Sequence, residues 1–171
     1  MKRCVILILL SAFFMSFLTS CLDSGPELNF SDIPYGVKLG CSYDKLLTCD
    51  TGASKLPDGQ VIHNSIDSSK WGYAEGVFSA MISYDIDDKD SLRSVTVHII
   101  YGNDSILAKD TSLFQKICEK MTEKYGRSDD DTIKIIQTWH DEDTDITVIY
   151  YDASESANHA IFIKFETHIN S

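Results

Sequence analysis

Hydrophobic and polar residues alternate along two neighbouring segments in the middle of the chain. In residues 78–86 every second position is apolar or aromatic, and residues 95–101 repeat this pattern. A period of two is typical of strands that bury one face. Residues 87–91, Asp-Asp-Lys-Asp-Ser, separate the two segments and are rich in turn-forming side chains. The pattern therefore predicts an antiparallel hairpin.

A helical period appears in one long segment and in one short segment. Apolar side chains form a stripe along residues 111–125, which predicts a helix there. Gly126 follows directly, where a left-handed residue commonly ends a helix. Ser42 is a favourable N-cap for a shorter helix over residues 42–49. Residues 50–72, rich in Gly, Ser, Asp and Asn, are expected to form a long loop.

Three further strands are expected near the end of the chain, over residues 133–140, 145–151 and 160–167. They follow the long helix as a three-stranded meander. The whole pattern predicts an α+β fold, with an antiparallel sheet of about five to seven strands and both helices packed on one face.

The first twenty residues have a different character from the rest of the chain. Lys2 and Arg3 precede residues 5–18, which carry no charge and are almost wholly apolar. About 14 residues are too few for a membrane-spanning helix, which needs roughly 20, but they suit the apolar region of a signal peptide. The run ends in Leu18-Thr19-Ser20-Cys21, in which two small residues precede a cysteine.

This tetrapeptide resembles the lipobox of bacterial lipoproteins. The resemblance implies that the thiol of Cys21 carries diacylglycerol, that a peptidase cuts before Cys21, and that the new amino group is acylated, for example with palmitate. Two or three acyl chains anchor a protein stably, whereas one chain binds marginally. The alternative interpretation is an ordinary cleaved signal peptide with a chance cysteine.

The same resemblance implies a location. In Gram-negative lipoproteins an Asp directly after the lipidated cysteine retains the protein in the inner membrane. Leu22 occupies that position here, which implies the outer membrane, facing the periplasm. In a host with a single membrane, the protein would lie on its outer face.

Three parts of the chain are therefore expected: a signal peptide over residues 1–20, a lipidated tether over residues 21–32, and one globular domain over residues 33–171.

Loss of Lys2 and Arg3 leaves 13 of the 15 basic residues against 26 acidic ones, a formal charge of −13. Such a surface repels nucleic acid, so a nucleic-acid partner is not expected. The domain loosely resembles small periplasmic α+β lipoproteins, a likeness that assigns no function.

The mature chain keeps three cysteines besides Cys21, namely Cys41, Cys49 and Cys118. If residues 42–49 are helical, about 12 Å separates Cys41 from Cys49, beyond the roughly 7 Å limit for a disulfide. A bridge between them would require that segment to be a loop. Cys118 lies on the apolar stripe of the long helix and is expected in the core.

Metal and cofactor sites are not predicted from the sequence. The five histidines (His63, His98, His140, His159 and His168) contain no pair at helical i, i+4 spacing and no HExxH motif. Acidic clusters at residues 85–90, 129–131 and 141–145 lack the spacing of a calcium loop and coincide with expected turns. No nucleophile motif is present either, so the chain is not expected to be an enzyme.

These observations favour a membrane-anchored, non-catalytic module that binds an envelope partner or maintains the envelope, with an unknown ligand. The predicted partner-binding residues are Trp71 and Tyr73, because the loop that leads to them is long for a connection. The alternative is that both aromatic rings fill the core. Two other functions stay open: an immunity or inhibitor lipoprotein that neutralises a basic protein, and a hydrolase that uses a thiol or a histidine.

Overall fold

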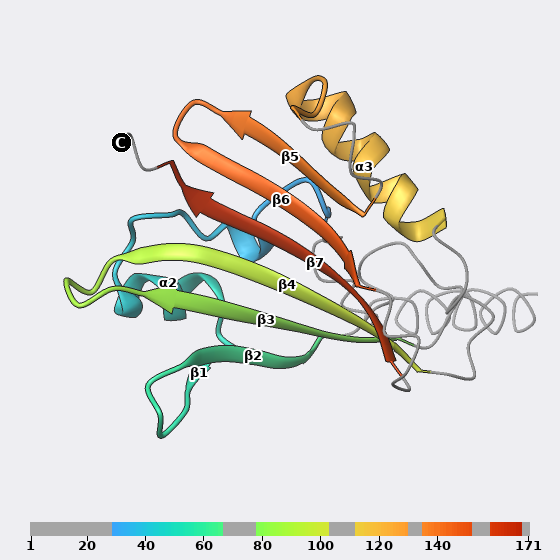
Figure 1. Ribbon diagram of the computed structural model, residues 1–171. Helices are drawn as coiled ribbons and strands as arrows, with labels where there is room; N and C mark the ends of the chain where they lie inside the picture. Colours follow the sequence, from blue (N-terminus) through green and yellow to red (C-terminus); the bar gives the residue numbers. More distant parts are fainter. Residues whose placement is uncertain (1–28, 67–77, 103–111, 130–134, 152–157, 169–171) are drawn as a thin grey trace, which may run out of the picture.

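The computed structural model describes residues 29–66, 78–102, 112–129, 135–151 and 158–168 (Figure 1). Within these residues the chain forms a seven-stranded antiparallel sheet with two α-helices, which confirms the α+β prediction. The elements, in chain order, are η1 (Pro34–Gly36), α2 (Tyr43–Cys49), β1 (Ser54–Lys55), β2 (Val61–Ile66), β3 (Phe78–Ile86), β4 (Leu92–Gly102), α3 (Ser112–Tyr125), β5 (Ile136–Asp141), β6 (Thr144–Tyr151) and β7 (Asn158–Thr167).

The order of strands across the sheet is β1-β2-β3-β4-β7-β6-β5 (Figure 1). Every neighbouring pair is antiparallel. The predicted hairpin is β3–β4, and the predicted meander is β5–β6–β7. The last strand, β7, lies between β4 and β6, so it joins the hairpin to the meander.

The strand register divides the side chains between two faces of the sheet. On the inner face a row of buried residues crosses from β3 to β5: Tyr84, Val95, Phe165, Ile146 and Trp139. One step along the strands, a row of polar residues crosses the outer face: Ser83, Thr96, Lys164, Thr147 and Thr138. This alternation is what a sheet with one buried face requires.

Both predicted helices are present, and their ends follow the expected chemistry. The side chain of Ser42 accepts a hydrogen bond from the backbone N–H of Lys45 at the start of α2. Gly126 adopts φ +85° directly after α3, and its N–H donates to the carbonyl of Thr122. The apolar stripe of α3 belongs to the buried core, where the ring of Phe114 lies 6.0 Å from that of Tyr150.

The expected loop over residues 50–72 was wrong in part, because it contains β1 and β2. Val61 and His63 point to the inner face and Ile62 to the outer face, but polar neighbours obscure this alternation in the sequence. Pairing with β3 holds β2 in the sheet, an effect of tertiary context that local propensity does not report. The packed part of the chain also includes Phe30, which is buried in the core.

The cysteine geometry agrees with the helical interpretation of residues 42–49. Cys49 is the last residue of α2 and Cys41 precedes its N-cap, and both thiols are free. Cys118 on α3 is also free and is buried, as predicted. In the part of the chain that the structure describes, no helix has the length and apolar character needed to cross a membrane.

Candidate functional site

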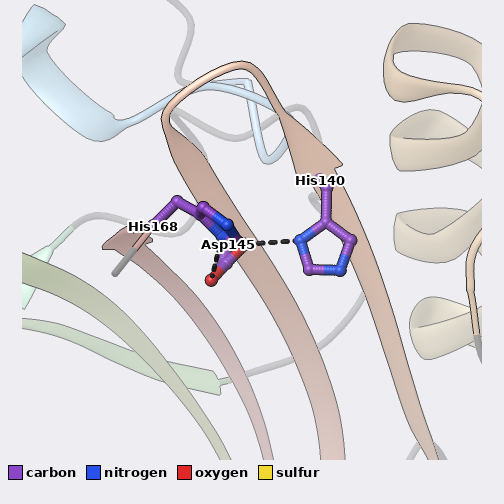
Figure 2. Close-up of side chains that lie close together, drawn as sticks. All are labelled: His140, Asp145 and His168. Carbon is purple, nitrogen blue, oxygen red and sulfur yellow. Dashed lines mark hydrogen bonds and ion pairs between the residues drawn. The ribbon is translucent and has the colours of Figure 1, made fainter. Parts of the chain in front are cut away.

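Two histidines and an aspartate meet at the β5–β6 end of the sheet: His140, Asp145 and His168, here called the His–Asp–His cluster (Figure 2). His140 near the end of β5 and Asp145 near the start of β6 are directly paired across the hairpin. His168 follows β7, and its backbone N–H donates to the carbonyl of Asp143 over 2.8 Å. Backbone hydrogen bonds therefore hold all three residues in place.

The two imidazole rings converge on a single carboxylate oxygen. Nδ1 of His168 lies 2.9 Å from Oδ1 of Asp145 and 3.1 Å from Oδ2. Nδ1 of His140 contacts the same Oδ1 atom from the other side. The centres of the two rings are 5.9 Å apart, in an edge-to-face arrangement. Figure 2 shows the side chains of His168 and Asp145 close together, with a dashed line from Asp145 to the ring of His140.

A second carboxylate orients the ring of His140. Nε2 of His140 lies 2.8 Å from Oδ2 of Asp129. Asp129 is itself positioned by the strand beside it, because its backbone N–H donates to the carbonyl of Thr138 over 2.9 Å. Carboxylates and imidazoles therefore alternate along a chain of contacts from Asp129 through His140 and Asp145 to His168.

The cluster is open to solvent and lies on the outer face of the sheet. The side chains of His140 and His168 are 52% and 40% exposed, whereas that of Asp145 is 23% exposed. Partial burial opposes ionisation of Asp145, but hydrogen bonds from the two histidines and their positive charge outweigh it and lower the pKa of this carboxyl. Asp145 is thus held as an acceptor between two donors.

Three side chains of the cluster offer ligand atoms of the kind that metal ions bind. One atom from each residue can be chosen so that all three lie within 4.8 Å of one another. Imidazole nitrogens together with a carboxylate oxygen form a common ligand set for first-row transition metals. The cluster is therefore suited to holding a cation between three elements of the sheet.

A second polar centre lies on the inner side of the sheet, around the carboxylate of Asp50. This side chain is 1% exposed and accepts hydrogen bonds from Tyr84 and from the backbone of Gly52. Nδ1 of His63 approaches it to 2.7 Å, and the ring of Tyr35 stacks on that of His63. These contacts tie α2 to β2 and β3, so the centre supports the fold.

The predicted lipid-attachment and partner-binding residues are not among those that form the described cluster. Cys21, Trp71 and Tyr73 lie outside the described residues. His98 stands apart from the cluster on the outer face, where it contacts Ser83 over 2.8 Å and burial lowers its pKa.

The cluster itself was not predicted. No metal site was expected, because the histidines show no i, i+4 pair and no HExxH motif and because the acidic cluster at residues 141–145 coincided with an expected turn. One signal was available, since pairing of the two strands around Glu142-Asp143 places Asp145 opposite His140. The position of His168 could not be found in this way, because it depends on the pairing of β7 with β6.

Comparison of the chain with protein-family models, with curated proteins and with solved structures finds no match.

Proposed function

We propose that the protein is a lipid-anchored lipoprotein of the bacterial cell envelope whose folded domain is a non-catalytic binding module. The proposed binding site is the His–Asp–His cluster. The observation that carries this proposal is the convergence of two exposed imidazole rings on one carboxylate at the solvent-accessible end of the sheet. The proposed location is the outer membrane, facing the periplasm, or the outer face of the membrane in a host with only one.

The anchor is proposed from Leu18-Thr19-Ser20-Cys21 and from the apolar run that precedes it. Residue 29, the first that the structure describes, follows Cys21 by eight residues. Eight residues reach at most about 29 Å when fully extended. With its lipid in the bilayer, Cys21 would therefore hold the domain close to the membrane surface.

We also propose that α2 and α3 cover the same face of the sheet, so that neither of the two described α-helices covers the outer face. Leu46 of α2 and Ile117 of α3 belong to one buried core together with Val148 of β6. Val148 lies in register with inward-facing residues of the neighbouring strands. The cluster, in contrast, lies in an outer-face row that includes Asp85, Ser94 and Glu166.

Fractionation of cells that express Cys21→Ala tests the anchor. Wild-type protein should appear in the membrane fraction and incorporate labelled fatty acid, whereas Cys21→Ala should lose the label and keep its leader. The matched control is Cys4→Ala, which removes a cysteine from the leader but leaves the tetrapeptide intact. A Cys21→Ala protein that matures normally and stays in the membrane would contradict the proposal.

Trp71 and Tyr73 remain proposed contacts for a protein partner. If the ring of Trp71 is exposed, Trp71→Ala should change stability by well under about 1 kcal/mol, as surface substitutions usually do. Recovery of envelope proteins by wild type and by Trp71→Ala, at low and at high salt, tests the contact. An unchanged set of partners, or destabilisation by about 3 kcal/mol or more, would remove Trp71 from the site.

A further inference from the structure

We propose that the His–Asp–His cluster binds one divalent transition-metal ion of the zinc class, through Nδ1 of His140, Nδ1 of His168 and a carboxylate oxygen of Asp145. This inference rests on the proposed function, because it names the ligand of the same site. Three independent features support it: the set of ligand atoms, the carboxylate of Asp129 that contacts Nε2 of His140, and the backbone hydrogen bonds that hold the three ligand residues in place.

The ligand set matches a zinc site with three protein ligands and one open position. Two imidazoles and one carboxylate bound at about 2.0–2.2 Å are a recurrent set for zinc, with solvent or a small molecule as the fourth ligand. In a tetrahedral site with such bonds, neighbouring ligand atoms are about 3.3 Å apart. Here Nδ1 of His168 is already 2.9 Å from Oδ1 of Asp145, and Nδ1 of His140 contacts the same oxygen. Small rotations of the exposed side chains would bring the three ligand atoms to the spacing of a tetrahedral site.

The contact between Asp129 and His140 is what a metal-binding histidine requires. Histidine ligands almost always donate their second ring N–H to a carboxylate, a carbonyl or water, which fixes the tautomer and the ring orientation. Nε2 of His140 has such a partner in Asp129, at 2.8 Å. When the ion binds, the proton on Nε2 stays with Asp129, so Nδ1 is the nitrogen that loses its proton and becomes the ligand. Asp129 is a positioning residue for the site.

Binding exchanges protons for the ion. Each imidazole must present an unprotonated Nδ1, so the proton that Nδ1 shares with Asp145 leaves to solvent as the nitrogen–metal bond forms. The carboxylate of Asp145 then binds the ion in place of the two N–H donors. No bond within the protein is made or broken, and no co-reactant is needed.

The chemistry of the cluster also indicates which cations it selects. Calcium takes six to eight oxygen ligands and magnesium prefers an octahedron of oxygens, whereas imidazole suits zinc, copper, nickel and iron. Two of the three ligands here are imidazoles. The exposed acidic residues Asp141, Glu142 and Asp143 in the adjoining turn raise the local concentration of cations of every kind. They therefore affect the rate of encounter more than the selectivity.

The test is a titration of the full-length protein in detergent micelles, purified through a tag without histidine. Calorimetry with ZnCl₂ should show one saturable site per chain, and CaCl₂ at the same concentration should give none. Visible absorption of Co²⁺ added in place of zinc should report a tetrahedral site. His168→Ala should weaken zinc binding at least 100-fold, and Asp129→Asn should weaken it about 10- to 100-fold, as loss of an outer-shell partner does.

The matched control is His98→Gln, which removes an outer-face histidine that lies apart from the cluster. It should bind zinc as wild type does, and circular dichroism should show that every variant is folded. Absence of saturable zinc binding, or equal binding by wild type and His168→Ala, would overturn the inference.

The failure of this inference is distinguishable from failure of the proposed function. If zinc does not bind but His168→Ala loses an envelope partner, the metal assignment fails and the binding module stands. If zinc binds through His168 but Cys21→Ala still matures normally in the membrane, the anchor fails and the metal site stands.

Discussion

The hydroxyl of Tyr84 donates a hydrogen bond to the buried carboxylate of Asp50 over 2.5 Å, joining β3 to the residue that follows α2. Burial and the hydrogen bond to Asp50 raise the pKa of Tyr84 well above its ordinary value, so the phenol stays protonated and remains a donor. Asp50 also accepts from the backbone of Gly52 over 3.0 Å and from His63. A buried carboxylate is tolerated only when its oxygens are satisfied in this way.

Removing the carboxylate of Asp50 should therefore lower the free energy of unfolding more than removing the hydroxyl of Tyr84. Asp50→Ala leaves the hydroxyl of Tyr84 and the N–H of Gly52 without their acceptor, and we expect a loss of about 3 kcal/mol in the free energy of unfolding. Tyr84→Phe removes a single hydrogen bond and should cost about 1–2 kcal/mol. Urea denaturation measures both values. Equal effects of the two substitutions would contradict the central role of Asp50.

The ring of His63 is the group nearest to a Cβ atom built at Gly52, so substitutions at the two positions should show coupled effects. A Cβ atom at position 52 would lie 2.4 Å from Cε1 of His63, and that ring is held by Asp50 and by stacking on Tyr35. Gly52→Ala should therefore destabilise the protein by about 1–3 kcal/mol, as overpacking does. In a His63→Ala background the same substitution should cost much less. A double-mutant cycle measures the difference, and additive effects would rule out the clash.

Cys118 should be an unreactive thiol in the folded protein. Burial, with a smaller contribution from the charge of Glu119, raises its pKa from 9.0 to about 12. The thiolate is the reactive form, and three units of pKa lower its fraction about 1000-fold at pH 8. Mass spectrometry after iodoacetamide labelling should show slow modification of Cys118 in the native protein and fast modification in urea. Cys49, which is half-buried, provides an internal comparison. Native and denatured rates within tenfold of each other would contradict the prediction.

The turn between β3 and β4 should become less stable in acid, because protonation of Asp87 weakens the contacts of its carboxylate. Its side chain accepts from the backbone N–H groups of Ser91 and Lys89 and from Nε of Arg93, all within 2.9 Å. These contacts, the one with Ser91 foremost, outweigh partial desolvation and lower the pKa of Asp87 below its ordinary value of 3.8. The charged form therefore stabilises the fold above about pH 4, and this contribution is lost as the pH falls through the lowered pKa.

Asp87→Asn keeps a turn-forming side chain but removes the charge that faces Arg93. Its melting temperature should lie below that of wild type at pH 6, and the difference should shrink at pH 2. The matched substitution at the neighbouring exposed residue, Asp88→Asn, should have little effect at either pH. A difference between wild type and Asp87→Asn that is the same at both pH values would contradict the assignment to the carboxylate.

The parts of the fold that were predictable are those in which the local pattern is complete. Every second residue of 78–86 is apolar or aromatic, and the α3 stripe is bounded by Gly126, so both elements were expected close to their observed bounds. β2 was missed because His63 and Asn64 interrupt its apolar residues, and because its stability comes from pairing with β3. Local patterns report the neighbours of a residue in the sequence but not its neighbours in the sheet.

The same reason explains why the His–Asp–His cluster was not predicted. His140 and Asp145 are brought together by one hairpin, which a register argument can supply. His168 joins them only because β7 pairs with β6, and the orientation of His140 depends on Asp129 at the end of another segment. A site assembled from several elements has no spacing in the sequence that reveals it.

The position of β7 inside the sheet, between β4 and β6, also determines when the protein can fold. β4 pairs with β7 between Ser94 and Glu166 and between Gly102 and Asn158, contacts that span 72 and 56 residues of chain. Long-range pairings of this kind form slowly, since the intervening chain must be ordered first. Until the last strand is available, β4 remains an open edge on which another chain could add. A nascent chain thus cannot close its sheet before β7 has been synthesised, so β4 stays unpaired on that side during most of translation.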